Sequence, residues 1–243
     1  MVIEKGDLAA KLRAAVEKAA VKMKTDVDDD SLSALIVYTE ELKRWNRAYN
    51  LVGRRLDEEG IVSLLIDAIS PLGIEGLFDE GKEVIDIGSG AGLPGIPLYL
   101  LAGPFSLTMV ESQRKKITFI RHICRKLSMG KARVYPGRVE EMAKQDEHLN
   151  AYEIALARAV MDPLRLIKTA RPLICEGGRL LLYIGKADGE RLRKKRFELE
   201  KKGAELEILR STQRLVGKEH FLATIRKKSD RITDTPGGTI SRS

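Results

Sequence analysis

The first 70 residues carry hydrophobic side chains at three- and four-residue steps, the spacing of one face of a helix. Leu8, Leu12 and Val16 show this spacing most regularly. The pattern predicts three helices, at 4–24, at 31–49 with Ser31 as the N-cap, and at 57–69. We therefore expect residues 1–72 to form a helical subdomain.

Beyond residue 72 the pattern changes to short runs of Val, Ile, Leu and Tyr that alternate with amphipathic stretches. This alternation predicts a parallel sheet covered by helices on both faces. Strands are expected at 83–87, 107–110, 132–135, 154–157 and 179–184, and helices at 94–102, 114–127 and 163–173. The runs 205–210 and 221–226 have no helical pattern between them and predict an antiparallel pair that closes the sheet. The α/β domain then covers 73–228, followed by a polar, loosely held tail at 229–243.

The composition is close to that of an average globular protein, with 43% hydrophobic and 32% charged residues. It excludes a collagen-like chain, a disulfide scaffold and a wholly disordered chain. The longest apolar run, 91–102, is interrupted by Gly and Pro and is shorter than the ~20 residues of a membrane span. The charged N-terminal segment lacks the apolar block of a signal peptide. We therefore expect a cytoplasmic protein with no membrane partner.

The net charge of +8 is unevenly distributed, with −2 over residues 1–70 and +10 over residues 71–243. Residues 112–144 contain ten Lys and Arg against two Glu, and residues 191–202 contain seven against two. A polyanion such as RNA is the natural partner of such segments, because each neutralised phosphate releases counterions. For the second segment, a solvated helix face is an equally good interpretation.

The most informative segment is 84–97, VIDIGSGAGLPGIP, in which a strand leads into a glycine-rich turn. Gly88, Gly90 and Gly92 permit φ > 0 and let a ligand approach bare backbone. Glu111 ends the next strand, where its carboxylate can accept hydrogen bonds from ribose hydroxyls. The turn can be aligned in two registers. Gly90-x-Gly92-x-x-Gly95 matches the dinucleotide motif of an NAD-dependent dehydrogenase, and Asp86-x-Gly88-x-Gly90-x-Gly92 matches that of S-adenosylmethionine-dependent methyltransferases.

Three features favour S-adenosylmethionine. The carboxylate of Asp86 can act on a sulfonium or ammonium group, directly or through water, whereas it would repel a pyrophosphate. The antiparallel closing pair is typical of the methyltransferase sheet, and a basic helix directly after Glu111 suits a nucleic-acid substrate. We therefore predict a class I methyltransferase fold, a Rossmann-like sheet with an antiparallel C-terminal pair, plus N-terminal helices. The dehydrogenase and a non-catalytic RNA-binding module remain alternatives.

The same residues resemble a known family. WNRAYNL at 45–51, DIGSGAGLPGIP at 86–97, RVEE at 138–141 and ARA at 157–159 occur in an order and spacing similar to those of the glucose-inhibited division protein B family, also called ribosomal small-subunit methyltransferase G. The resemblance covers residues ~30–228. It implies methyl transfer from S-adenosylmethionine to N7 of a guanine in the 530 loop of bacterial 16S rRNA, with that RNA as the partner. The large basic surface with few aromatic residues favours RNA within a small-subunit particle over free RNA, and both stay open at this point.

The resemblance also implies roles for individual residues. Gly88 and Leu93 would line the cofactor, Glu111 would hold its ribose, and Val139 and Glu140 would flank its adenine. Arg158 would lie by the methionine end and the incoming base, and Asn46 and Lys115 would face the RNA. There is one departure: the family usually has Arg-His where this chain has Ser63-Leu64, before Leu65-Ile66-Asp67-Ala68. The role of that histidine is not carried over.

Motifs that the chain lacks restrict the chemistry. No proline pair follows the fourth predicted strand, as exocyclic-amine methylation usually requires, and neither Cys124 nor Cys175 follows a proline, as a cytosine-C5 nucleophile typically does. Both are expected to be core thiols, and the three histidines form no metal-ligand cluster. Guanine N7 carries no proton at neutral pH, so its methylation needs no general base, only in-line orientation.

Arg158 is the first candidate for positioning the substrate, by donating to O6 or to a phosphate. In the basic segment, Arg114, Arg121 and Arg125 share a face of one predicted helix, near the mouth where RNA enters. Together with Lys115, Asn46 and Arg138 they form the predicted RNA-binding set, and no metal is expected. With only 5% aromatic residues, recognition should depend on phosphate contacts and RNA shape.

Overall fold

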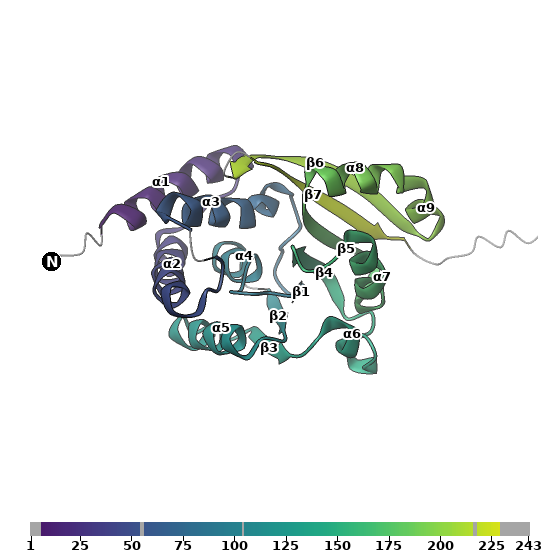
Figure 1. Ribbon diagram of the computed structural model, residues 1–243, viewed down its shortest axis with the longest axis horizontal. Coiled ribbons are helices and arrows are strands. Elements are labelled where there is room, and N and C mark those ends of the chain that lie inside the picture. The colour runs from purple at the N-terminus through teal and green to yellow at the C-terminus, as the bar shows by residue number, and fades with distance from the viewer. Residues whose placement is uncertain (1–5, 54–55, 104, 216–217, 229–243) are drawn as a thin grey trace, which may run out of the picture.

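The computed structural model describes residues 6–53, 56–103, 105–215 and 218–228 (Figure 1). The expected tail at 229–243 lies outside these residues. None of the described helices is both long enough and apolar enough to span a bilayer.

Three helices precede the sheet, as predicted. They are α1 (Gly6–Met23), α2 (Asp29–Tyr49) and α3 (Glu58–Ala68), followed by the 3₁₀ turn η1 (Ser70–Gly73). Helix α2 begins two residues earlier than predicted, because Asp28 is its N-cap and accepts a hydrogen bond from the backbone N–H of Ser31 at 2.8 Å. The predicted cap, Ser31, is therefore already inside the first turn.

Seven strands of the described chain form one sheet. They are β1 (Glu83–Ile87), β2 (Ser106–Glu111), β3 (Ala132–Pro136), β4 (Tyr152–Arg158), β5 (Ile174–Gly185), β6 (Ala204–Leu215) and β7 (Lys218–Lys227), in the order β3-β2-β1-β4-β5-β7-β6. Neighbours among β1 to β5 pair in parallel, and β7 lies antiparallel between β5 and β6. The predicted antiparallel pair that closes a parallel sheet is confirmed.

The remaining helices connect the strands. They are α4 (Gly95–Ala102), α5 (Arg114–Lys126), α6 (Val139–Met142), α7 (Pro163–Ala170), α8 (Lys186–Lys194) and α9 (Arg196–Lys201), with 3₁₀ turns η2 (Asp146–His148) and η3 (Arg171–Leu173). The predicted helix at 163–173 thus ends as an α-helix at Ala170 and tightens into η3 at Arg171-Pro172, since proline has no N–H for the helical ladder.

The sheet separates two hydrophobic cores, because successive strand residues point to opposite faces. On β4, Ile154 and Leu156 pack with helices α1 to α5, whereas Ala155 and Ala157 pack with α6 to α9. Figure 1 shows α1, α2 and α3 beside α4 and α5, away from α6 and α7. The N-terminal helices therefore share a core with one face of the sheet.

The strand order reverses between β1 and β4: from β1 the chain continues outward to β2 and β3, and then returns to β4 on the other side. In open α/β sheets, ligands bind at such a switch point, outside the carboxyl ends of the strands. The glycine-rich turn follows β1, so it lies at this position.

Candidate active site

The turn after β1 needs glycine for two physical reasons. Gly88, Gly90 and Gly92 have φ of +67°, +59° and +83°, in the left-handed region that side chains rarely adopt. A Cβ on Gly88 would lie 2.7 Å from the methyl carbons of Val160, and one on Gly92 would lie 2.2 Å from Cδ1 of Ile96. A Cβ on Gly90 would meet only the carbonyl oxygen of Gly88, at 3.9 Å, so the backbone is open on that side.

Glu111, the last residue of β2, is bound to this turn. Its Oε2 accepts the backbone N–H of Gly90 at 2.9 Å, and its Oε1 accepts those of Ser112 and Gln113 at 2.9 and 2.8 Å. A carboxylate has about four lone-pair positions, so three amide bonds leave capacity for a ligand hydroxyl. Glu111 also lines the adjacent cavity, as expected of a ribose acceptor.

Asp86 is bonded to the start of helix α4. It is fully buried, and its Oδ2 accepts the N–H of Gly95, the first residue of α4, at 3.0 Å. Oδ1 has no hydrogen-bond partner among the described atoms. Burial, with a smaller contribution from Glu111 and against the hydrogen bonds from Gly95 and Ser89, raises the pKa of Asp86 to about 7. Asp86 therefore holds the glycine turn against the N-terminus of α4. Its action on a cationic ligand, directly or through water, stays a prediction.

A cavity of about 290 Å³ opens beside the turn. Its walls are the segments that follow β1, β2, β3 and β4, namely Ile87, Gly88, Val110, Glu111, Ser112, Gln113, Lys116, Gly137, Arg138, Val139, Glu140, Ala159, Val160 and Met161. The sequence-based candidates Gly88, Glu111, Val139 and Glu140 thus meet around one space. The contact of Val139 and Glu140 with an adenine stays a prediction.

The cavity suits S-adenosylmethionine chemically. A nucleoside finds bare backbone at Gly88, a carboxylate for its ribose at Glu111, and apolar walls at Val139 and Val160. The cavity walls carry two carboxylates, Glu111 and Glu140, and two cations, Lys116 and Arg138.

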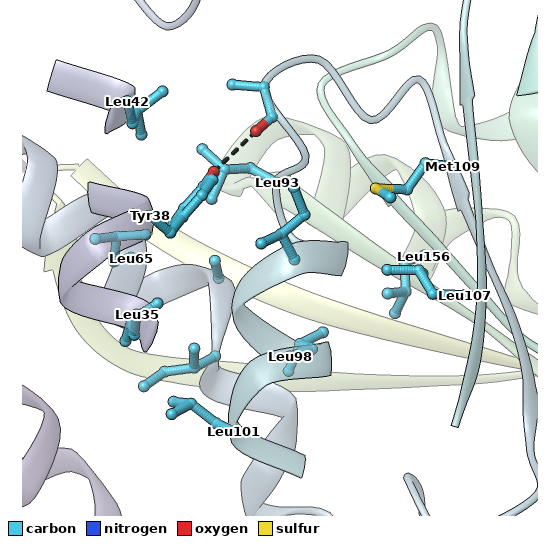
Figure 2. Close-up of a cluster of buried hydrophobic side chains, with 14 of the residues drawn as sticks. Leu35, Tyr38, Leu42, Leu65, Leu93, Leu98, Leu101, Leu107, Met109 and Leu156 are labelled. Carbon is cyan, nitrogen blue, oxygen red and sulfur yellow. Dashed lines mark hydrogen bonds between the residues drawn. The ribbon is translucent and has the colours of Figure 1, made fainter. Parts of the chain in front are cut away.

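Helix α2 supports the glycine turn from the other side. The hydroxyl of Tyr38, a fully buried residue, donates a hydrogen bond to the carbonyl oxygen of Ala91 at 2.9 Å. Figure 2 shows Tyr38 with this bond, in the core beside Leu93. Leu93 is part of this core and is not among the walls of the 290 Å³ cavity, and its contact with the cofactor stays a prediction.

Arg158, at the end of β4, is tied to helix α3 instead of lining the cavity. Its Nη2 lies 3.2 Å from Oδ2 of Asp67, and its Nη1 donates to the carbonyl of Leu64 at 3.2 Å. The guanidinium also lies 5.9 Å from the ring centroid of Tyr183. The next residues, Ala159 to Met161, do form cavity wall. Arg158 thus borders the site as part of an ion pair, and its role in positioning the substrate stays a prediction.

Asn46 does not face solvent. Its side chain is 6% exposed, donates to the carbonyl of Gly53 at 2.8 Å and accepts from the N–H of Val52 at 2.9 Å. These bonds close the loop after α2. Both ends of the Asn46 amide are thus engaged in shaping the backbone, and its contact with RNA stays a prediction.

The basic helix α5 begins at the cavity. Arg114, Lys115 and Lys116 form its first turn, which contains no acidic residue. Cations at a helix N-terminus oppose the helix dipole, by about 0.3–1 kcal/mol each, so helix stability does not explain this placement. Lys116 and Arg138 line the cavity, whereas Arg121 and Arg125 are exposed about 10 and 16 Å further along the helix. An anion at the cavity mouth thus meets Arg114, Lys115 and Arg138 first.

Both cysteines are half-buried and lie outside the cavity walls. Burial raises the pKa of the Cys124 thiol to about 11 and raises that of Cys175 as well. His122 contacts Glu41 and His148 contacts Tyr152. Among the described residues no group of three or more His, Cys, Asp or Glu could hold a metal ion.

Several cavity residues were not predicted from the sequence as cofactor contacts. They are Ser112, Gln113, Lys116, Gly137, Ala159, Val160 and Met161, and Arg138 was expected to bind RNA only. One signal was available. All of them follow the carboxyl ends of β2, β3 and β4, the edge at which α/β sheets bind ligands.

Comparisons with known proteins agree with this geometry. A family model described as rRNA small subunit methyltransferase G matches residues 31–221. A ribosomal RNA small subunit methyltransferase G of Clostridium botulinum is 29% identical over 218 residues, 87% of this chain and 89% of that protein. The protein of the same name from Alkaliphilus metalliredigens is 31% identical over 159 residues, 65% of this chain and 66% of its own length.

Among solved structures, fibrillarin of Aeropyrum pernix in complex with S-adenosyl-L-methionine superposes with a TM-score of 0.52 at 15% identity, covering 68% of this chain and 73% of that one. This likeness shows the fold alone. The family match over residues 31–221 shows S-adenosylmethionine as the cofactor, and its binding at the glycine turn stays a prediction. The chain belongs to the rRNA small subunit methyltransferase G family and is an S-adenosylmethionine-dependent methyltransferase.

Proposed function

We propose that this enzyme methylates N7 of a guanine in the 530 loop of bacterial 16S rRNA, within a small-subunit particle. The observation that carries the proposal is the cavity between the glycine turn and the basic first turn of α5, in a chain whose family model covers residues 31–221. Methyl transfer and RNA approach then occur at one edge of the sheet. A dehydrogenase does not explain the basic mouth, and a purely RNA-binding module does not explain the glycine cradle.

Guanine N7 is the acceptor that needs least from the wall residues. Arg138 and Lys116 line the cavity, which contains no His, Cys or Tyr among its described wall residues. Guanine N7 has a free lone pair and no proton to remove, so an in-line displacement at the sulfonium methyl needs orientation only. Orientation supplies about 7–11 kcal/mol of the barrier in favourable cases.

The cofactor supplies the electrophilic methyl group, and the chain's residues do the rest. The open backbone of the glycine turn receives the nucleoside end, and Glu111, held by the N–H of Gly90, receives its ribose hydroxyls. Arg158, held by Asp67, is positioned at the end of β4 to direct the guanine through O6 or a phosphate. A bond from Arg158 to N7 itself would block the transfer.

The proposal is tested by methyl transfer to small-subunit particles that lack the modification, with labelled S-adenosylmethionine. We expect label on one guanine of the 530 loop, at N7, where the methylated ring becomes sensitive to reduction and strand cleavage. Label on an exocyclic nitrogen, on ribose or on another loop contradicts it. Free 16S rRNA is assayed in parallel. If it is methylated at the same rate as the particle, the proposal that the assembled particle is the substrate is contradicted.

A further inference from the structure

A row of matched side chains joins helices α2 and α5. On α2, Glu41, Trp45 and Tyr49 recur every four residues and form one stripe. On α5 the facing stripe, running in the opposite direction, is Lys115, Phe119, His122 and Lys126. We call these residues the α2–α5 seam.

At the buried end of the seam, one carboxylate is surrounded by three basic side chains. Glu41, 7% exposed, contacts His122 at 2.9 Å, Arg44 at 2.5 Å and Lys126 at 3.4 Å. Burial alone would raise the pKa of Glu41, but the hydrogen bonds from His122 and Arg44 outweigh it, so the pKa is lowered. This end of the seam holds the two helices together.

The middle of the seam is aromatic. The ring centroid of Trp45 lies 5.5 Å from that of Phe119, 5.2 Å from that of His122 and 5.4 Å from that of Tyr49. Phe119 is in turn 6.3 Å from Tyr38, whose hydroxyl holds Ala91 in the glycine turn. The contacts are tilted, the arrangement that aromatic pairs favour.

The other end of the seam is exposed and has a different character. Tyr49, at the last position of α2, is 47% exposed, and the ammonium of Lys115 lies 5.9 Å from its ring centroid. That distance is at the long limit of a cation–π contact, so moving Lys115 away from the ring costs little. Lys115 belongs to the basic first turn of α5, and the next residue, Lys116, lines the cavity.

We propose that Tyr49 stacks against an unpaired nucleobase of the RNA substrate, while Lys115 moves from the tyrosine ring to a neighbouring phosphate. The proposal rests on RNA being the substrate. Proteins hold single-stranded nucleic acid with this combination of an exposed ring and adjacent cations. The cations come from the first turn of α5, where they oppose the helix dipole: Arg114, Lys115 and Lys116. A base stacked on Tyr49 would add one ring to the aromatic row of the seam.

A purely structural role for Tyr49 makes a different prediction. If its ring only shields Trp45 from water, any apolar side chain of similar size replaces it. Leucine retains apolar bulk and removes the flat π face, whereas phenylalanine retains that face and removes the hydroxyl. The pair Tyr49→Leu and Tyr49→Phe therefore separates stacking from packing.

The chain contains a matched control. Phe197 on α9 is 67% exposed and has the ammonium of Lys201 4.4 Å from its ring centroid, but it is absent from the cavity walls and lies on the opposite face of the sheet from α5. Figure 1 shows α9 and α5 on opposite sides of the molecule. Phe197→Leu thus repeats the change at a second exposed ring with a lysine above it.

The experiment measures the affinity of each full-length variant for unmodified small-subunit particles between about 50 and 200 mM salt. We expect Tyr49→Leu to bind roughly 5- to 150-fold more weakly, the effect of losing one stacked base, with an unchanged salt slope. Tyr49→Phe and Phe197→Leu should bind like the wild type. Lys115→Ala should reduce the salt slope by about one phosphate. All four should bind S-adenosylhomocysteine normally.

Wild-type affinity of Tyr49→Leu overturns the proposal, as does an equal loss in Tyr49→Phe or in Phe197→Leu. If Tyr49→Leu fails to fold, ultraviolet cross-linking of the wild-type complex replaces it. A Tyr49 peptide joined to RNA supports stacking, and its absence while other cross-links are recovered contradicts it. If the wild type methylates N7 and Tyr49→Leu binds the particle with unchanged affinity, the stacking proposal fails and the proposed function stands. If the wild type neither binds nor methylates the particle, the proposed function itself fails.

Discussion

The hydroxyl of Tyr38 donates a hydrogen bond to the carbonyl oxygen of Ala91 at 2.9 Å, so a side chain of helix α2 fixes the turn that forms the cofactor cradle. We expect Tyr38→Phe to lose about 1–3 kcal/mol of unfolding free energy, because a buried carbonyl loses its donor. The affinity for S-adenosylhomocysteine should fall as well, as the turn is less constrained. Urea unfolding and calorimetric titration measure the two effects.

Tyr183→Phe is the control for that prediction. Tyr183 is also buried, and its hydroxyl donates to the carbonyl of Ala68 at 2.6 Å, at the end of α3. Loss of the Tyr183 hydroxyl should lower the unfolding free energy by a similar amount and leave the affinity for S-adenosylhomocysteine unchanged. If both variants bind S-adenosylhomocysteine equally well, the bond to Ala91 has no effect on the cradle.

The cradle itself is tested by Gly88→Ala. The new Cβ is strained at φ +67° and lies 2.7 Å from Val160, on the cavity wall, so we expect at least tenfold weaker binding of S-adenosylhomocysteine. Gly76→Ala has the same φ of +67° but meets nothing nearer than Oδ2 of Asp79 at 3.6 Å. Gly76→Ala should therefore lower the unfolding free energy and leave the affinity for S-adenosylhomocysteine unchanged. Equal cofactor affinity of the two variants contradicts the prediction.

The buried carboxyl of Asp86 makes stability depend on pH. Its pKa rises from the ordinary 3.8 to about 7 on folding, so the folded state holds a proton that the unfolded state releases. The contribution of Asp86 to stability is therefore fully present below about pH 4 and is lost as the pH rises toward 7. Asp86→Asn keeps an oxygen for the N–H of Gly95 and should flatten this part of the stability curve. Urea unfolding of both proteins from pH 4.5 to 8 measures the difference, and parallel curves would refute it.

Variants of the Arg158–Asp67 ion pair test whether Arg158 acts in catalysis or only stabilises the fold. Removing one partner of a buried ion pair typically costs 3–5 kcal/mol, so Arg158→Met should destabilise the protein strongly. The double variant Asp67→Asn/Arg158→Met removes both charges and should recover much of that loss. If Arg158 directs the substrate, the double variant stays inactive although it is folded. Recovery of methyl transfer together with stability would show that Arg158 serves only the ion pair with Asp67.

Features that depend on neighbouring residues along the chain could be predicted from the sequence. Strand β1 was predicted at its observed bounds, and the turn at Gly88 to Gly92 was predicted from a rule about φ. Glu111 was located because it ends the strand that follows the turn. These features need only near neighbours along the chain.

Other features depend on contacts that no local pattern encodes. Arg158 is tied to Asp67, 91 positions earlier, and Asn46 uses its amide on its own loop, and neither contact could be predicted from the sequence pattern. Asp86 accepts a hydrogen bond from the first residue of α4, which the sequence pattern did not predict. The residue types were right, but the direction of each side chain is decided by packing between α2, α3 and the sheet.

The central claim is that the glycine turn beside Glu111 binds the cofactor, and Gly90→Asp tests it most directly. A carboxylate there projects into the open side of the turn, beside Glu111, whose Oε2 accepts the N–H of residue 90 at 2.9 Å. Calorimetric titration with S-adenosylhomocysteine should show one site in the wild type and no binding in a folded Gly90→Asp variant. Normal binding by that variant would contradict the account.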